Sequence, residues 1–515
     1  MQYDLIHYIS GSIPFGIWLL PIVGAAFTFV WWVVWIGTKF WSMNQFWKTL
    51  VYGWLVTVLL YSSVWLADRP SPIPQRVMIV EINQNSWEAT AMREIVYHYL
   101  DQTTLPLTII NAENAPSIKA DNNLIESIDN LAGKMRCKWI IKVQGSSESE
   151  ENECRANISL IKESKYLETN EILADFKHQS VKASIESIHG ELSRILGENF
   201  NKSDTHRKAF TLPDSSLKSY FSALRLFDLD SLNYAEEIIS GICELENCPG
   251  SVLRKLAYIK MRNKPGTKKD EIHDLLIRAL HENPNDFASL LLFGEYFLHF
   301  REWDEAESAL KLALSKNSSD PRIYFYLSRL DEDRLTELKW ETQKKLLKRA
   351  LHLSPGYEAA SLNLSDHFKG RLEKRQAILV LEEGLQIDSN SVALLLSKSA
   401  LQLEMSFHQS GIETCKRILE VKPLHSGALY NIGMGLIFLE KFDEGISYLE
   451  RSLANGGSVD NYYYMGIGYE RKGDFDKAIY YFEKRHTNPL TFDDKVAFSA
   501  KNRVLRIKKW LKDGN

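Results

Sequence analysis

Three patterns of hydrophobic and polar positions follow one another along this chain of 515 residues. No charged residue occurs from Ile13 to Gly37 or from Thr49 to Ala67. Between about residues 76 and 200, short β-branched runs alternate with helical patterns, and from Pro213 to Pro489 apolar residues recur at intervals of three and four. We therefore expect a multi-domain chain with a transmembrane α-hairpin, a small α/β domain with a mixed sheet, and an all-α solenoid.

Each of the two uncharged runs is long enough to cross a bilayer as a helix. A rise of about 1.5 Å per residue carries roughly 20 residues across the hydrocarbon core. Residues 1–70 are therefore predicted to form a two-helix transmembrane anchor. Lys39 and Lys48 lie in the connecting loop, which the positive-inside rule places in the cytoplasm. This topology predicts a multi-pass protein of a bacterial inner membrane, with residues 69–515 in the periplasm.

The stretch from residue 76 to residue 200 is predicted to fold as a small α/β domain. Strands are expected at residues 77–82, 105–110, 139–143, 155–162 and 172–176, and helices at 87–100, 121–132 and 181–196. The turn after the first strand, Asn83 to Ser86, contains no glycine, so a dinucleotide could not approach its backbone closely. No cofactor is expected in this domain.

This order of elements, between a membrane segment and a helical array, resembles the TolB-amino-terminal-like module in the periplasmic half of CadC-type membrane regulators. The resemblance implies a role in sensing for the α/β domain. Those regulators carry a winged helix-turn-helix before their membrane helix, whereas too few residues precede Ile13 here to hold one. Direct binding of DNA is therefore not expected.

The repeat array places small and aromatic residues at fixed positions of a helix pair. In the last copy these are Gly466, Ala478 and Phe482, and the glycine occurs 33 positions earlier as Gly433. The pattern resembles the tetratricopeptide repeat (TPR), which has a unit of about 34 residues. About eight units fit between residues 213 and 489. The resemblance implies a superhelix whose concave wall binds extended or helical peptide segments.

The TPR resemblance also implies which side chains face the groove. They lie on the first helix of each pair, three residues before and one, four or five after the small residue. The partner-binding residues selected by this rule are Tyr430, Tyr463, Glu470, Arg471, Leu291, Glu295, His299, Asp366 and Lys369.

Residues 490–515 are predicted to contain a C-terminal capping helix. Apolar residues recur there at helical spacing, from Val496 through Ala500 and Val504 to Ile507, among many lysines and arginines. A solenoid needs a polar end, which favours a cap. A basic amphipathic helix that touches anionic lipid is the alternative.

Charge and cysteine content exclude several functions. The net charge of −4 gives no general basic field for a nucleic acid. No two of the five cysteines form a C-x-x-C pair, so no zinc site is expected. Cys243 and Cys248 could close a small loop in an oxidising compartment, but their spacing is not a recurring motif and we favour free thiols. A bridge between Cys137 and Cys154 is disfavoured because they lie out of register on the arms of a predicted hairpin.

No catalytic motif is present. The sequence lacks H-E-x-x-H, G-x-S-x-G and G-x-x-x-x-G-K-[ST]. Ser159 and Lys162 match S-x-x-K, but in a strand residues three apart point to opposite faces. We expect no enzyme, no metal site and no cofactor.

These patterns together predict a membrane-anchored TPR scaffold that binds a protein or peptide partner and positions a complex at the lipid bilayer. The alternative is a CadC-like extracytoplasmic sensor that signals to a separate transcriptional regulator. The short predicted cytoplasmic loop, Thr38 to Lys48, favours the scaffold because a sensor needs a cytoplasmic output.

Overall fold

The structure is a computed structural model that describes most of the chain after residue 74. The described residues are 75–81, 87–101, 107–110, 134–137, 139–144, 154–162, 165–174, 180–196, 210–245, 248–263, 268–331, 334–335, 342–491 and 493–512. The predicted transmembrane helices and the predicted helix at 121–132 lie outside these residues. Within them, no helix combines the length and apolar character needed to cross a membrane.

Five described strands form one mixed sheet in the order β2-β1-β3-β4-β5. They are β1 (Gln75–Glu81), β2 (Leu107–Ile110), β3 (Trp139–Gln144), β4 (Cys154–Lys162) and β5 (Lys165–Ala174). β1 runs parallel to β2 and β3, whereas β4 is antiparallel to β3 and β5. The predicted mixed sheet is confirmed.

The last strand differs from its predicted bounds. It begins at Lys165, not at about residue 172, because a two-residue connection returns the chain at once and pairs Lys162 with Lys165. The first residues of β5 are largely polar, so hydrophobic periodicity did not reveal them.

Two helices of the described part of this domain accompany the sheet, α4 (Trp87–Asp101) and α6 (Val181–Leu196). α4 packs on β1 to β4, and α6 packs on β5 and α4. Met92, Ile95 and Val96 of α4 have no solvent exposure, like Ile188 and Leu192 of α6. These apolar faces make the core of the α/β domain.

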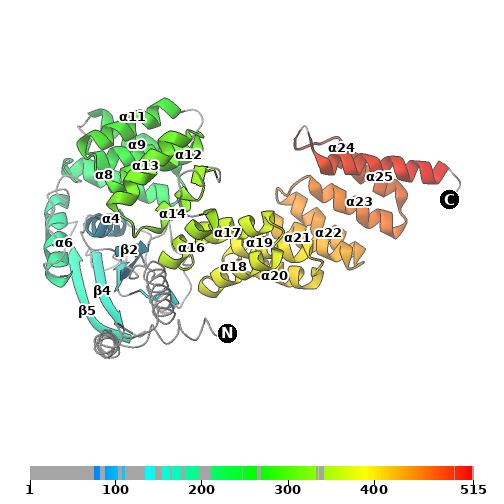
Figure 1. Cartoon of the computed structure of the whole chain (residues 1–515), viewed down its shortest axis with the longest axis horizontal. Coiled ribbons are helices and arrows are strands. Elements are labelled where there is room, and N and C mark those ends of the chain that lie inside the picture. The colour runs from blue at the N-terminus through cyan, green and yellow to red at the C-terminus, as the bar shows by residue number, and fades with distance from the viewer. Residues whose placement is uncertain are drawn as a thin grey trace, which may run out of the picture. The chain divides into compact units, whose positions relative to one another are not determined.

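Eight helix pairs follow within the described residues, in agreement with the predicted count (Figure 1). The first four pairs are α8 (Asp214–Asp228) with α9 (Leu232–Leu245), α10 (Gly250–Asn263) with α11 (Lys269–Glu282), α12 (Phe287–His299) with α13 (Trp303–Lys316), and α14 (Pro321–Leu327) with α16 (Gln343–Leu353). The last four are α17 (Glu358–Gly370) with α18 (Lys374–Ile387), α19 (Val392–Glu404) with α20 (His408–Val421), α21 (Ser426–Phe438) with α22 (Phe442–Ala454), and α23 (Asp460–Lys472) with α24 (Phe475–His486). The array is an all-α solenoid of paired helices, and α25 (Lys495–Lys512) packs on its last pair.

Glycines allow the helices of a pair to approach closely, as the sequence predicts. A Cβ at Gly433 would lie 2.7 Å from Cγ of Leu449, and a Cβ at Gly466 would lie 2.7 Å from Cδ1 of Phe482. Both contacts are too short for carbon atoms, so the close packing of α21 on α22 and of α23 on α24 requires glycine.

The fourth pair is irregular. The sequence predicts a longer first helix or turn in this unit. α14 covers only seven residues, and α16 begins at Gln343.

The α/β domain and the first helix pairs share one hydrophobic core. Buried residues of α4, α6 and β1 belong to the same cluster as those of α8 to α14. All described residues accordingly lie in one compact unit that begins at Pro74.

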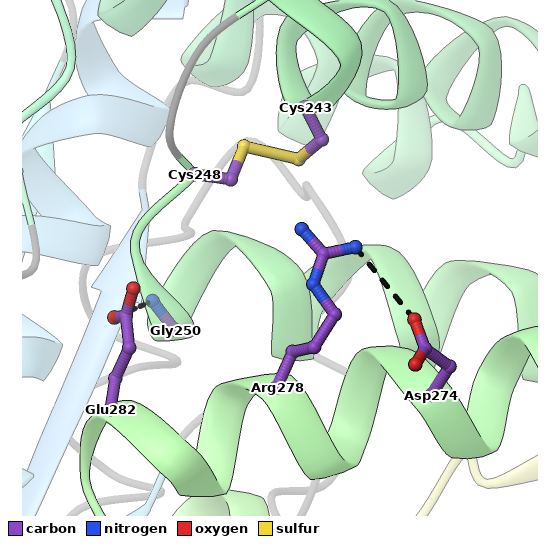
Figure 2. Close-up of a disulfide and its surroundings, with 6 residues drawn as sticks. All are labelled: Cys243, Cys248, Gly250, Asp274, Arg278 and Glu282. Carbon is purple, nitrogen blue, oxygen red and sulfur yellow. Dashed lines mark hydrogen bonds and ion pairs between the residues drawn. A yellow bond between two sulfur atoms is a disulfide. The ribbon is translucent and has the colours of Figure 1, made fainter.

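Cys243 and Cys248 form a disulfide, so the prediction of free thiols is wrong (Figure 2). The connection between α9 and α10 brings their Cα atoms to 5.1 Å, within the usual range for a disulfide. The next turn is held by Glu282, whose carboxylate accepts a hydrogen bond of 2.5 Å from the backbone N–H of Gly250. Cys137 is free and buried, as expected, because β3 and β4 pair Gln144 with Arg155 and place Cys137 at the other end of the hairpin from Cys154.

Candidate protein-binding groove

The first helices of the pairs form a layer in two stretches, α10 to α14 and α17 to α23. α10 contacts α12, α12 contacts α14, and the same holds along α17, α19, α21 and α23. Such a layer forms the inner wall of a helical-repeat solenoid. We call the exposed side of this layer the groove.

The first part of the layer is covered by α4 of the α/β domain. Arg93 of α4 forms an ion pair of 2.7 Å with Asp228 at the end of α8. Arg322 Nη2 of α14 donates a hydrogen bond of 3.2 Å to the hydroxyl of Tyr97 on α4. The chain's own helix therefore lies where the resemblance to TPR proteins places a partner.

A cavity of about 870 Å³ remains between α4 and the first helices. Its charged lining residues are Arg93, Arg254, Lys255, Arg262, Arg322, Arg329, Glu94, Asp228, Asp230 and Glu295. Asp286 and Asp320 lie beside the cavity and pair with Arg254 at 2.6 Å and with Arg322 at 2.8 Å. The cavity thus has six cationic side chains and six carboxylates in or beside its lining. Because these charges balance, the cavity has no electrostatic preference for an anionic ligand.

Two titratable groups of α4 lie in this cavity, the half-buried Glu94 and the buried His98. Burial opposes the charge of Glu94, but Lys255 and Arg93 outweigh it and lower the pKa of Glu94 to about 2. Burial, and then the charge of Arg254, lowers the pKa of His98 to about 4. At neutral pH Glu94 is therefore charged and His98 is neutral.

The predicted partner-binding residues of α12 lie in two different environments. Leu291 and Glu295 line the cavity, and Leu291 is only 4% exposed. His299, near the end of the same helix, is exposed. Leu291 and Glu295 therefore face the cavity beside α4 instead of open solvent.

The last part of the layer is covered by α25. The hydroxyl of Tyr463 lies 2.9 Å from the hydroxyl of Ser499, and Glu470 forms ion pairs with Arg503 and with Arg506, the latter at 3.1 Å. The capping helix thus contacts both predicted groove residues.

The middle of the layer holds the other predicted residues. Asp366 is exposed, and Lys369 pairs with Glu404 on the neighbouring first helix at 2.6 Å. Tyr430 is half-buried, and burial raises its pKa. Arg471 is exposed at the end of α23.

Tyr430 and Arg471 lie in a group of side chains whose other members the groove rule did not select. The ring centroids of Tyr430 and Tyr464 are 5.7 Å apart, and those of Tyr464 and Phe438 are 6.2 Å apart. The guanidinium of Arg471 lies 5.9 Å from the centroid of the Phe438 ring. His408 stacks on the Phe438 ring, with the two ring centroids 5.0 Å apart. We call Tyr430, Phe438, Tyr464, His408 and Arg471 the rim cluster. The tyrosine run at 462–464 was the signal in the sequence that could have drawn attention to it.

No protein-family model matches this chain, and no curated protein sequence does.

Several solved structures contain similar arrays of helices. MamA from Desulfovibrio magneticus RS-1 is 16% identical, with 32% of this chain and 92% of that chain aligned at a TM-score of 0.28. YrrB, described as a TPR protein with an unusual peptide-binding site, is 19% identical, with 38% and 98% aligned at a TM-score of 0.30. The Cut9–Hcn1 hetero-tetramer of APC/C is 14% identical, with 64% of each chain aligned at a TM-score of 0.40. We draw no functional conclusion from these likenesses.

Proposed function

We propose that this chain is a non-enzymatic, membrane-anchored scaffold that binds a segment of a protein partner on the groove from α17 to α23. One observation carries the proposal: the chain's own helices α4 and α25 pack on the first and last helix pairs, whereas among the described elements only repeat helices pack on α19 and α21. The middle section is thereby left for a partner, and its rim cluster holds aromatic and arginine side chains of the kind that dominate protein interfaces.

The rim cluster defines the chemistry of the partner segment. Phe438 is 37% exposed, and Arg471 above it is exposed. An apolar or aromatic anchor on the partner packs against Phe438 and Tyr464, and a neighbouring carboxylate pairs with Arg471. We therefore propose a segment with an aromatic residue next to an acidic one.

Residues 1–70 are proposed to hold this scaffold in a bacterial inner membrane, with residues 69–515 on the extracytoplasmic side. The disulfide between Cys243 and Cys248 supports that side, because disulfides persist in oxidising compartments and are rare in the cytosol. Reporter fusions after Asn515 and near Trp41 test the topology. A cytoplasmic reporter signal at Asn515 would contradict it.

Site-specific photocrosslinking tests the groove. A photoreactive residue in place of Tyr430 is expected to give adducts with a partner in intact cells. A matched replacement of Tyr480, which is 51% exposed on the second helix α24, serves as the control. Adducts of equal yield at both positions, or adducts at Tyr480 alone, would show that the partner does not use the groove. Replacement of Arg471 by glutamate is expected to reduce the Tyr430 adduct and leave the thermal stability unchanged.

A sensor is the second candidate, and the cavity beside α4 is the observation that favours it. A ligand that enters this space contacts the α/β domain and the repeats together, so its binding would couple the two. The scaffold predicts that partner binding requires the rim cluster. The sensor predicts that signalling requires the cavity and survives replacement of Phe438 and Arg471.

A further inference from the structure

Helix α25 has two faces, and only one of them packs on the repeats. Ala500, Val504 and Ile507 are at most 7% exposed and contact the last helix pair. A second row of side chains, spaced by three or four residues, is exposed to solvent. We call this row the outer stripe; it consists of Phe498, Lys501, Leu505, Lys509 and Lys512. Capping and contact with another surface therefore use different sides of one helix.

All charged residues of α25 are basic. Its sequence contains five lysines and two arginines and no acidic residue. Arg503 and Arg506 pair with Glu470, and Lys508 pairs with Glu483 at 2.8 Å. Within the part of the chain that the structure describes, no carboxylate pairs with a lysine of the outer stripe. Their positive charges are therefore not neutralised by an ion pair within the described residues and can interact with an external partner.

Two large apolar side chains belong to the outer stripe, Phe498 at its start and Leu505 between Lys501 and Lys509. Phe498 is 65% exposed and Leu505 is 58% exposed, although both are costly to leave in water. Apolar side chains interleaved with lysines match the boundary between acyl chains and anionic headgroups, where a helix lies parallel to the membrane.

A protein surface is a poorer match for the outer stripe. A stable protein interface uses about 20–30 residues on each side and is depleted in lysine, whereas the stripe is a single row on one helix. A bilayer needs no complementary shape, so one row of side chains is enough for contact.

We propose that the outer stripe of α25 docks on the surface of a bilayer that contains anionic lipid, while the buried face of the same helix caps the repeats. This contact is additional to the proposed anchor and does not depend on the partner of the groove. Each lysine at an anionic surface strengthens binding on the order of fivefold. Loss of three lysines therefore weakens docking on the order of 100-fold, and high salt weakens it as well.

An environment-sensitive fluorophore on α25 tests the proposal in the full-length chain. The label is attached to a cysteine that replaces the exposed Asn502, which lies beside Phe498 and Leu505 on the helix. The chain is reconstituted into lipid nanodiscs of phosphatidylcholine alone or with phosphatidylglycerol. Emission is expected to shift to shorter wavelength, and brominated lipid to quench it, only when phosphatidylglycerol is present.

Variants of the lysines separate lipid docking from damage to the fold. The triple variant K501Q/K509Q/K512Q is expected to lose the shift, and the triple arginine variant to retain it, with equal thermal stability of both. The same label in place of Glu420, exposed on α20, should not respond to lipid. A shift in phosphatidylcholine alone, or one that persists in the glutamine variant, would overturn the proposal.

The label also distinguishes a lipid surface from an acidic protein as the partner of the outer stripe. A shift on addition of polyglutamate in detergent, without one in anionic nanodiscs, would assign the stripe to an acidic protein and overturn the lipid proposal. Co-elution of the chain with nanodiscs measures the anchor separately. If the anchor failed, added phosphatidylglycerol vesicles would still be expected to shift the label, because the label reports α25 alone.

Discussion

The guanidinium of Arg76 on β1 donates a hydrogen bond of 2.8 Å from Nε to the backbone carbonyl of Leu353, the last residue of α16. Nη2 donates to the carbonyl of His352 at 2.5 Å, and Nη1 to that of Met135 at 2.7 Å. The last carbonyls of a helix have no partner within the helix and carry partial negative charge, so a buried arginine is well suited to this position. One side chain thus joins the sheet to the fourth helix pair.

Replacement of Arg76 by methionine is expected to loosen that connection. It leaves the carbonyls of His352 and Leu353 without their donor, and hydrogen bonds from a charged group contribute about 1.5–3 kcal/mol each. We expect the free energy of unfolding to fall by about 3 kcal/mol. Denaturant titration measures the loss, and faster amide exchange in β1 and in the last turn of α16 locates it.

The control for Arg76 is replacement of the exposed Lys348, on the same α16, by methionine, which is expected to change stability by less than about 0.5 kcal/mol. Equal effects of the two variants would show that Arg76 does not join the sheet to the repeats.

Acidification is expected to destabilise the chain through His98. Its pKa is about 4 in the folded protein, because burial and Arg254 disfavour the charge, and about 6.5 when unfolded. Between these values the unfolded state binds more protons, so stability falls as the pH is lowered from about 6.5 towards 4. Linkage gives a loss of about 2 kcal/mol between pH 7 and pH 5. Glu94 titrates below this window, because its pKa is about 2.

The variant His98→Gln removes this titration. Its stability, measured by denaturant unfolding, is expected to depend less steeply on pH from 7 to 5. His281→Gln, at an exposed position of α11, should keep the slope of the parent protein. A parental slope in His98→Gln would disprove the assignment.

The disulfide leads to a third prediction. Cys243 and Cys248 are separated by five positions, and the chain-entropy relation for so small a loop gives about 2 kcal/mol. The double variant C243S/C248S is expected to lose that much stability. Isolation without reductant should yield a chain in which iodoacetamide does not modify these two residues before reduction, as read by mass spectrometry.

The free cysteines Cys137 and Cys415 provide the control for alkylation. Burial raises the pKa of Cys137 to about 12 and that of Cys415 to about 11, so both thiols should stay unmodified until the protein is unfolded. Alkylation of Cys243 in the native, unreduced chain would contradict the disulfide.

Local patterns were enough to predict most of the described fold. The helix at 181–196 has its predicted bounds, and Gly433 and Gly466 pack as the TPR pattern requires, because each feature depends on residues within one repeat or one helix. The start of β5 at Lys165 was missed because its residues are polar.

Contacts between segments that are far apart in the sequence, including those that cover the groove, could not be predicted in the same way. Arg76 and Leu353 are 277 positions apart, and no periodicity links them. The groove rule placed Tyr463 and Glu470 correctly on a first helix, but the sequence does not show that α25 returns to contact them. Side chains selected by a family rule are therefore open to a partner only where the chain itself leaves them uncovered.

A buried arginine positions α25, and its replacement gives the last prediction. Arg485 is fully buried; it donates to carboxylates of Asp460 at 2.6 Å and Asp494 at 2.7 Å. Asp494 in turn accepts hydrogen bonds from the backbone N–H groups of Val496 and Ala497 at the start of α25, both at 3.0 Å. The backbone hydrogen bonds from Ala497 and Leu490, followed by the bond from Arg485, hold the pKa of Asp494 well below its usual range.

Arg485→Met leaves two carboxylates without their cation, and loss of one partner of a buried ion pair costs about 3 kcal/mol or more. We expect that loss of stability, together with faster amide exchange confined to α24 and α25. Asp494→Asn keeps an oxygen that can cap the helix, so it should loosen α25 less. Arg451→Met, at an exposed position of α22, is the control and should change stability by less than about 0.5 kcal/mol. If α25 exchanged no faster in Arg485→Met than in Arg451→Met, the buried arginine would not be what fixes the capping helix.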